Sequence, residues 1–496
     1  VGGDRQPRGA LVPERRATGC RRWPAARVGA AIILAMSIPP RSTKAESPGT
    51  STLSTLERRA GPSGSLLLVE PNHALPLVHV IVAIRSGSSW DPHKKDGLMN
   101  LMGEVARRGA AGRTREQLDR QLDALGATLD VETDADSIRL QGHVLARHLD
   151  DYLRITADVL LRPDFSAAEF ARTRREILAD IEESRNDDQA LGQRFFIRNL
   201  YSDHPYGHSP EGDQASLERV RRDDLVVHHR RHVVGPNVVI AAAGDVNVDD
   251  FAARVQRLFA TLPRAAAPGP NPLAVREPQP PQGWRIQIVD KPDRQQAQVL
   301  FGHFGVRSSD PDFVPLLVAI SSFGGHGMKS TLMDELRTKR GLAYGTYMGL
   351  AGRLNRGPVR GWFFTSNANT VSTLKLVLRL YVTLMENGID EQRLAFAKAF
   401  LAGSQVSEVD DPGQRLAARV KYEIAGNGTL NAGFVDELPA RVRAVTATQV
   451  KAAVLRHLRA RDLAITVVAT AADLWTRLVD AKVQPGAIDV VPYDSY

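Results

Sequence analysis

The sequence lacks the features that mark several classes of protein. It has one cysteine in 496 residues, Cys20, so a framework of disulfide bonds is excluded. Its most apolar uninterrupted stretch, residues 28–38, is too short to span a bilayer. Beyond the first 45 residues the formal charge is close to neutral, which gives no reason to expect a nucleic-acid-binding protein.

The first 45 residues are more basic than the rest of the chain. They hold nine basic and two acidic residues, which accounts for most of the net formal charge of +8. Arg21, Arg22 and Arg27 precede the apolar stretch, an order typical of a secretory signal peptide. We therefore expect residues 1–45 to be a leader, cleaved after Ala45, and the chain to be exported to the bacterial periplasm. Cys20 lies ahead of the apolar stretch, so it is no lipid-attachment site; the alternative is an upstream extension without a role.

The body of the chain follows one plan twice. Residues 263–283 are rich in proline, which disfavours helix and central strand, so we expect an extended linker there. On each side of it come two apolar strands, a polar turn, helices, and a closing helix followed by an apolar strand. We predict a leader (1–45), a first half (46–262), the linker (263–283) and a second half (284–496). The fold class is α+β, with each half a largely antiparallel sheet covered by helices.

Local signals support this arrangement. Thr114 with Gln117, and Thr446 with Gln449, have the spacing of capping boxes that begin helices. Gly126 is placed to end the first of these helices. Residues 137–144 alternate apolar and polar side chains, as in a half-buried strand.

Residues 97–104 carry the motif on which the functional interpretation depends. They follow the apolar strand 78–84 and resemble the inverted zinc-binding helix, H-x-x-E-H, of the pitrilysin/insulinase-type metallopeptidases. In that motif two imidazoles hold Zn²⁺ and the glutamate activates water. Here Asn100 and Glu104 stand at the histidine positions and Gly103 at the glutamate position, while Asp180 stands where the family's third ligand, a glutamate, is expected. The resemblance therefore implies a degenerate zinc site that cannot perform the family's hydrolysis.

Further segments match the family in the same order over most of the chain. They are residues 126–136, 177–181, 204–208 with Gly212, and 237–245. In the second half, residues 324–344 resemble the glycine-rich loop and the Arg/Tyr pair of the processing-peptidase-like members. By that resemblance Gly324, Gly325 and Gly327 would bind substrate, and Arg337 and Tyr344 would reach a partner's zinc site. We expect Arg337 in the last turn of a helix that ends at Gly341, and Tyr344 at the start of a strand.

Three other patterns carry less weight. Residues 324–331 lack the G-K-[ST] sequence of a phosphate-binding P-loop. His228 and His232 have helical spacing, but with Arg230 and Arg231 between them we expect a solvated basic face and no metal. His204 and His208 flank a proline and are expected to be loop residues. Oxygen ligands of Asn100, Glu104 and Asp180 could collect a hard cation, without restoring hydrolysis.

Two functional hypotheses follow from the resemblance. In the first, the chain is a non-catalytic subunit that completes a heterodimeric zinc peptidase acting on unfolded peptides, and its partner is a homologous chain with an intact H-x-x-E-H. In that case this chain binds no cofactor itself, and the zinc belongs to the partner. In the second, it is a structural or peptide-binding relative with no part in catalysis. A self-sufficient zinc protease ranks third.

Overall fold

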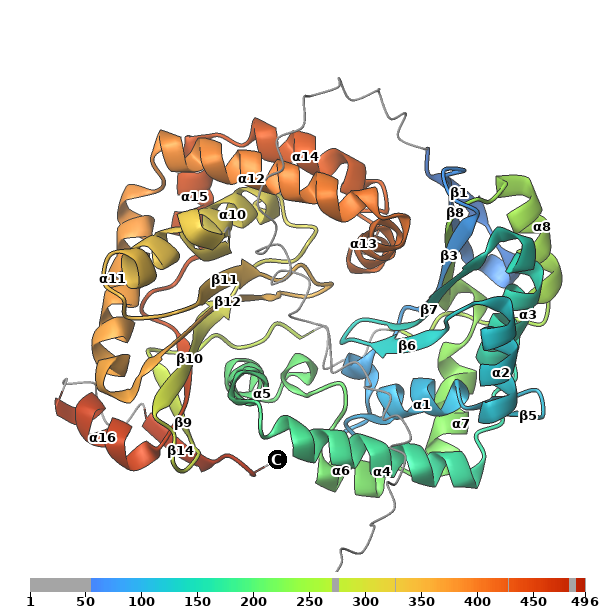
Figure 1. The fold of residues 1–496 in the computed structure, drawn as a ribbon, viewed down its shortest axis with the longest axis horizontal. Helices are drawn as coiled ribbons and strands as arrows, with labels where there is room; N and C mark the ends of the chain where they lie inside the picture. Colours follow the sequence, from blue (N-terminus) through green and yellow to red (C-terminus); the bar gives the residue numbers. More distant parts are fainter. Residues whose placement is uncertain (1–54, 270–275, 326, 427, 481–487, 496) are drawn as a thin grey trace, which may run out of the picture. The chain divides into compact units, whose positions relative to one another are not determined.

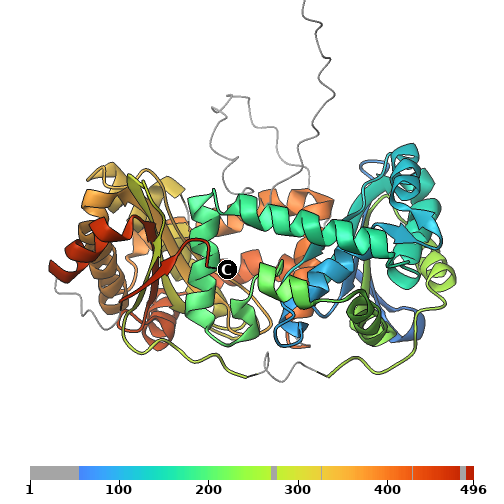
Figure 2. The ribbon, with the colours of Figure 1, turned by 90° about the horizontal axis from the view of Figure 1, so that it is seen from below.

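The structure is a computed structural model that describes residues 55–495 except 270–275, 326, 427 and 481–487. The predicted leader, residues 1–45, lies outside the described residues. Among those described, no helix combines the length and the apolarity that crossing a membrane requires. Residues 263–269 and 276–284 run without helix or strand, in keeping with their prolines (Figure 2).

Two six-stranded sheets organise the described chain (Figure 1), so the predicted fold class is confirmed. The first has the order β1-β2-β8-β3-β7-β6, and only the pair β2–β8 is parallel. The second has the order β11-β12-β10-β13-β9-β14, with β13–β9 and β9–β14 parallel. The strands are β1 Glu57–Ala60, β2 Leu66–Pro71, β3 Leu77–Ile84, β6 Asp130–Thr133, β7 Ile138–Leu145, β8 Val238–Gly244, β9 Arg285–Asp290, β10 Gln296–Phe304, β11 Thr346–Leu350, β12 Pro358–Ser366, β13 Ala464–Ala469 and β14 Ile488–Pro492, with a small hairpin of β4 Gly109–Ala110 and β5 Arg113–Thr114.

Helices cover both sheets. In the first half they are α1 Leu98–Ala106, α2 Arg115–Leu125, α3 Leu149–Leu161, α4 Ala167–Ser184, α5 Asp188–Tyr201, α6 Gln214–Arg219, α7 Arg222–His232 and α8 Val248–Leu258. In the second half they are α10 Phe313–Ile320, α11 Thr370–Asn387, α12 Glu391–Asp410, α13 Pro412–Ala425, α14 Phe434–Ala444, α15 Ala447–His457 and α16 Ala471–Asp480. Both predicted capping boxes form, at the starts of α2 and α15, and Gly126 ends α2 in the left-handed conformation with φ of 62°.

The sequence repeat reappears in the strand connections. In each half the first long strand runs parallel to the closing strand, and the second long strand pairs with the same closing strand in the antiparallel sense. The trio β2-β8-β3 therefore corresponds to β9-β13-β10. This shared topology is what a duplicated unit would produce.

Each sheet buries its second face under a helix from the other half. α13 packs Leu416 and Val420 against Ile81 and Ala83 of β3 and against alternate residues of β8. α5 packs against β10 and β13, where Phe196 contacts the cluster around Leu300 (Figure 1). Because both faces of the central strands are covered, their side chains are buried in both directions, and β8 is buried at every position.

Buried charges join α13 to the first sheet. The Glu70 carboxylate on β2, 1% exposed, is paired with Arg415 and, at 2.7 Å, with Arg419. Arg419 also forms two hydrogen bonds with Asp436, of 2.8 and 2.9 Å. A carboxylate and two guanidiniums removed from water are tolerated only because each satisfies the others. These pairs fix α13 to one place on the sheet.

Replacing Glu70 with glutamine should therefore destabilise the fold strongly. The change removes the buried charge that Arg415 and Arg419 share, while Arg419 keeps Asp436, and we expect a loss of about 3–5 kcal/mol in the free energy of unfolding. The matched control is Glu437→Gln, which breaks an exposed pair with Arg441 and should cost less than about 1 kcal/mol. The measurement is the midpoint of urea unfolding for each variant. Equal midpoints for the two variants would show that the buried pairs do not hold α13.

Candidate functional site

The degenerate motif lies at the start of the first helical layer, on α1. The helix begins after Gly97, whose φ of 90° favours glycine. The carboxylate of the buried Asp91 accepts hydrogen bonds from the backbone amides of Gly97 and Met99, at 2.7 and 2.8 Å. These two contacts satisfy amides that the first turn leaves without partners. Asp91 is thus the residue that fixes where the motif begins, and its cap was not recognised in the sequence.

At Gly103, α1 lies close against the sheet. A Cβ atom on this residue would lie 2.9 Å from a methyl group of Val131 on β6 and 3.1 Å from one of Ile138 on β7. Both neighbours are β-branched side chains with little rotamer freedom. Position 103 therefore lacks a base, and it also lacks room for one unless β6 moves.

Glu104 faces a guanidinium. Arg108, in the turn that follows α1 and largely buried, lies 3.7 Å from the Glu104 carboxylate and forms an ion pair with Glu176 on α4. Arg172 binds the other oxygen of Glu176 at 2.9 Å. Burial raises the pKa of Glu104, and the positive charge of Arg108 opposes that rise. The Arg108 guanidinium therefore lies between the carboxylates of Glu104 and Glu176.

Asp180 takes no part in these contacts. It lies on α4, as predicted, but its side chain is exposed, and the residue that contacts α1 through Arg108 is Glu176, one turn earlier. Partial loss of hydration raises the pKa of Asp180, and the nearby charges of Glu176 and Glu183 act in the same direction. Among the described histidines, cysteines and carboxylates, Glu104 and Asp180 do not belong to a cluster with metal-ligand spacing. This donor set does not fit Zn²⁺, which takes imidazole, thiolate or converging carboxylate ligands.

In the second half, the glycine-rich segment packs directly on strand β11. The segment is not the regular helix that we expected. Residues Ser321–Gly325 and Met333–Thr338 form wide π-type turns, with a 3₁₀ turn at Gly327–Lys329. A Cβ atom on Gly324 would lie 2.6 Å from the Met348 side chain and 2.9 Å from its backbone nitrogen. Gly324 is therefore required by the packing, whatever else it does.

Arg337 and Tyr344 are brought together by this segment. The Arg337 guanidinium carbon lies 4.6 Å from the centre of the Tyr344 ring, a cation–π contact. The chain between them turns at Gly341, whose φ is 61°, and Tyr344 precedes β11 by two residues instead of entering it. Tyr344 is 71% exposed, with its ring near Phe364. The Tyr344 phenol is thus open to a second molecule, whereas Arg337 is half-buried.

The histidine pairs behave differently from one another. His228 and His232 stack on α7 with ring centroids 5.7 Å apart, and His232 also meets the edge of Trp90. His232 is 1% exposed, so the predicted solvated face is wrong for this residue; Trp90, far away in sequence, covers it. Burial lowers the pKa of His232 to about 3. His204 and His208 do flank a short 3₁₀ turn, and His208 contacts Asp96 at 2.6 Å.

Family models and relatives match most of the chain. Residues 67–214 match a model described as insulinase, peptidase family M16, and residues 219–401 match one described as the peptidase M16 inactive domain. A non-peptidase homolog, YmxG, of Helicobacter pylori is 23% identical and aligns with 81% of this chain and 91% of its own. An uncharacterized zinc protease of Mycobacterium tuberculosis is 26% identical, over 84% of this chain and 93% of its own.

Solved structures give the same result. A crystal structure from Pseudomonas fluorescens, titled as a peptidase M16 inactive domain, has 26% identity and a TM-score of 0.77, and covers 84% of this chain and 97% of that one. A protease from Helicobacter pylori has a TM-score of 0.76 at 17% identity, over 84% and 100% of the two chains.

The chain should hold no stoichiometric zinc. Even with two imidazoles restored, as Asn100→His with Glu104→His, the Arg108 charge should keep zinc affinity low. Adding Arg108→Ser should then raise affinity at least about tenfold, since a unit charge at this range costs on the order of 1–4 kcal/mol. Elemental analysis and zinc titration make the measurement. One tightly held zinc in the unaltered chain would contradict this account of the site.

Acid should destabilise the fold through His232. Its pKa is about 3 in the folded chain and near 6.5 when unfolded, so below about pH 6.5 the unfolded state binds more protons. The folded state therefore loses stability as pH falls, by about 2 kcal/mol at pH 5 from this residue alone. His232→Leu should flatten the dependence of the urea midpoint on pH.

Proposed function

The chain belongs to the insulinase family of peptidases, family M16, as a non-catalytic member, and from this we propose that it completes the active site of a homologous partner. The partner would carry an intact H-x-x-E-H and the zinc, and this chain would supply Arg337 and Tyr344. The substrate class we propose is unfolded peptides. We further propose that both chains are exported and that the pair acts in the periplasm.

The observation that carries the proposal is the contrast between the two sites. On α1 the motif lacks its ligands, its base and the space for one, and Arg108 sits between the carboxylates. Around Tyr344 the two side chains lie together: the Arg337 guanidinium contacts one face of the ring, and the phenol is exposed. A chain that only held a structure together would have no need for an exposed phenol supported by a guanidinium.

The chemistry of the pair suits the attack of water on a peptide bond. The partner's metal centre would supply the activated water. Negative charge then develops on the carbonyl oxygen of the substrate, and the Tyr344 hydroxyl can donate a hydrogen bond to it. The Arg337 guanidinium, with its planar set of donors, can hold a neighbouring peptide carbonyl and so fix the register of the peptide. Gly324, Gly325 and Gly327 would let the peptide backbone approach.

Tyr344→Phe should lower peptide hydrolysis by the mixed complex by about 10²–10³-fold, because one oxyanion donor is lost. Arg337→Ala should also lower it strongly, and Arg337→Lys should restore little because the fork of donors is missing. Neither change should affect assembly, measured by gel filtration. The control for the chemistry is Tyr493→Phe, the same change at a tyrosine outside the segment, and Asn100→Ala should also have little effect.

The competing hypothesis is a scaffold or peptide-binding relative. The Helicobacter relative described as a non-peptidase homolog is consistent with either role. If the partner is fully active alone, or if the mixture is indifferent to Tyr344→Phe, the scaffold hypothesis replaces ours.

A further inference from the structure

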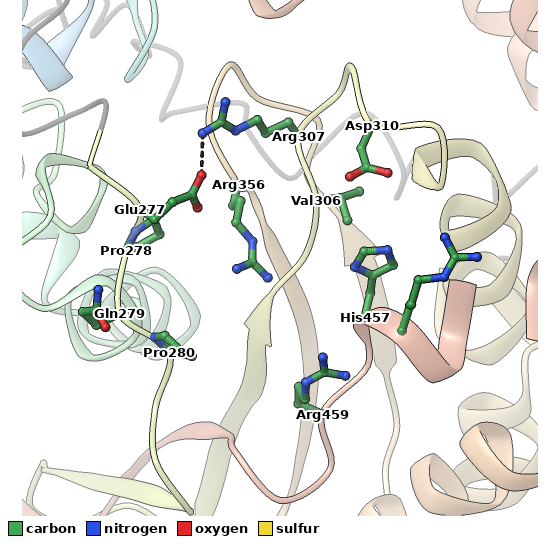
Figure 3. Close-up of a pocket in the computed structure, with 11 residues that line it drawn as sticks. Glu277, Pro278, Gln279, Pro280, Val306, Arg307, Asp310, Arg356, His457 and Arg459 are labelled. Carbon is green, nitrogen blue, oxygen red and sulfur yellow. Dashed lines mark hydrogen bonds and ion pairs between the residues drawn. The ribbon is translucent and has the colours of Figure 1, made fainter. Parts of the chain in front are cut away.

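A basic cavity lies in the second half, apart from the Arg337/Tyr344 segment and from α1. It has a volume of about 600 Å³ and opens between residues 277–280 of the linker, the turn after β10, the β11–β12 connection and the end of α15 (Figure 3). Its lining contains four arginines, Arg307, Arg356, Arg456 and Arg459, against the two carboxylates of Glu277 and Asp310. The volume is typical of sites for small molecules.

Two of the four arginines are paired with carboxylates. Arg307 forms an ion pair with Glu277, and Arg456 with Asp312 at 2.8 Å. Asp312 also accepts from His457 at 2.7 Å, so this carboxylate is already satisfied. Asp310, Asp312 and His457 have the spacing of a metal cluster, but the neighbouring Arg456 guanidinium already provides the positive charge there.

Arg356 and Arg459 have no carboxylate partner in the part of the chain that the structure describes. The Arg356 Nε donates to the Gly305 carbonyl at 2.9 Å, and an Arg459 terminal nitrogen donates to the Leu458 carbonyl at 2.9 Å. Each bond orients its guanidinium and leaves other donors unused, since a guanidinium has five. Figure 3 shows both groups between the Pro278–Pro280 stretch and the end of α15.

The positions of the two arginines are fixed from the core. The Arg459 amide donates to His303 at 3.3 Å, and the other contact of that imidazole nitrogen is the Tyr381 hydroxyl at 2.6 Å. His303 and Tyr381 are both buried. The Arg356 carbonyl accepts from the Tyr201 hydroxyl of α5 at 2.8 Å, and its guanidinium lies 5.8 Å from the Phe304 ring centre. The backbones of both residues are therefore held in place, and the Arg356 guanidinium is further oriented by Gly305 and Phe304, while the Arg459 side chain is exposed.

We propose that this cavity binds a small phosphorylated organic molecule. A phosphate presents several oxygens in a tetrahedral arrangement, so guanidiniums from separate segments can bind it from different sides. A planar carboxylate would use one such fork. Pro278 and Val306 add an apolar wall against which the organic part can pack. The proposal does not rest on the proposed function, because the cavity includes neither Arg337 nor Tyr344.

The test is calorimetric titration of the full chain with phenyl phosphate at neutral pH and low salt, with inorganic phosphate and succinate as comparisons. We expect one-to-one binding of phenyl phosphate that is tighter than that of either comparison. Arg356→Gln and Arg459→Gln should each weaken it about tenfold, which corresponds to losing one charged hydrogen-bonding group. Arg441→Gln, an exposed arginine paired with Glu437 on α14, is the control and should leave binding unchanged.

Thermal unfolding provides a second measurement that does not depend on any variant. Phenyl phosphate should raise the unfolding midpoint of the unaltered chain, because a ligand that binds only the folded state stabilises it. Absence of both heat and shift in the unaltered chain would overturn the proposal. The proposal would also be overturned if succinate bound as tightly as phenyl phosphate. The same holds if Arg441→Gln weakened phenyl phosphate binding as much as Arg356→Gln or Arg459→Gln. If inorganic phosphate bound as tightly as phenyl phosphate, the claim that the ligand carries an organic group would be overturned.

Discussion

The pairing of Glu70 with Arg415 and Arg419 is the constraint on which the arrangement of the body depends. It joins β2, near the start of the first half, to α13, far along the second. Apolar contacts would hold α13 against the sheet in several positions, because Leu416 and Val420 are not directional. The ion pairs select one position, since a displaced helix would leave buried charges unpaired. In the same way, α5 of the first half packs on the second sheet. Neither half can therefore be regarded as a separate structural unit.

Much of the fold could be predicted because its signals are local. The strands β3 and β10 are largely apolar, and Thr114 and Thr446 begin helices through contacts three residues away. The exchange of α5 and α13 could not be predicted in this way. Both helices have an apolar face, but nothing in the sequence of a helix states which sheet will cover it. The π-type turns at Met333–Thr338 were missed for a related reason, since they depend on how the segment packs against β11.

The same distinction between local signals and tertiary packing applies to the candidate site. The loss at Asn100, Gly103 and Glu104 was visible because the motif spans little more than one helical turn. The role of Arg108 was not, because its partner Glu176 is 68 residues away and is recognised only when α1 and α4 lie together. The burial of His232 depends in the same way on Trp90. Sequence reasoning thus identified what the site had lost and missed what had replaced it.

The space around Gly103 has a consequence for any attempt to rebuild the site by substitution. Val131 and Ile138 lie where the Cβ atom of a larger residue would begin. Reversion at that single position would meet a steric clash before it gained a base, and it would still lack both imidazoles and face the charge of Arg108. Rebuilding the motif would therefore require changes around Val131 and Ile138 and at Arg108, together with those on α1.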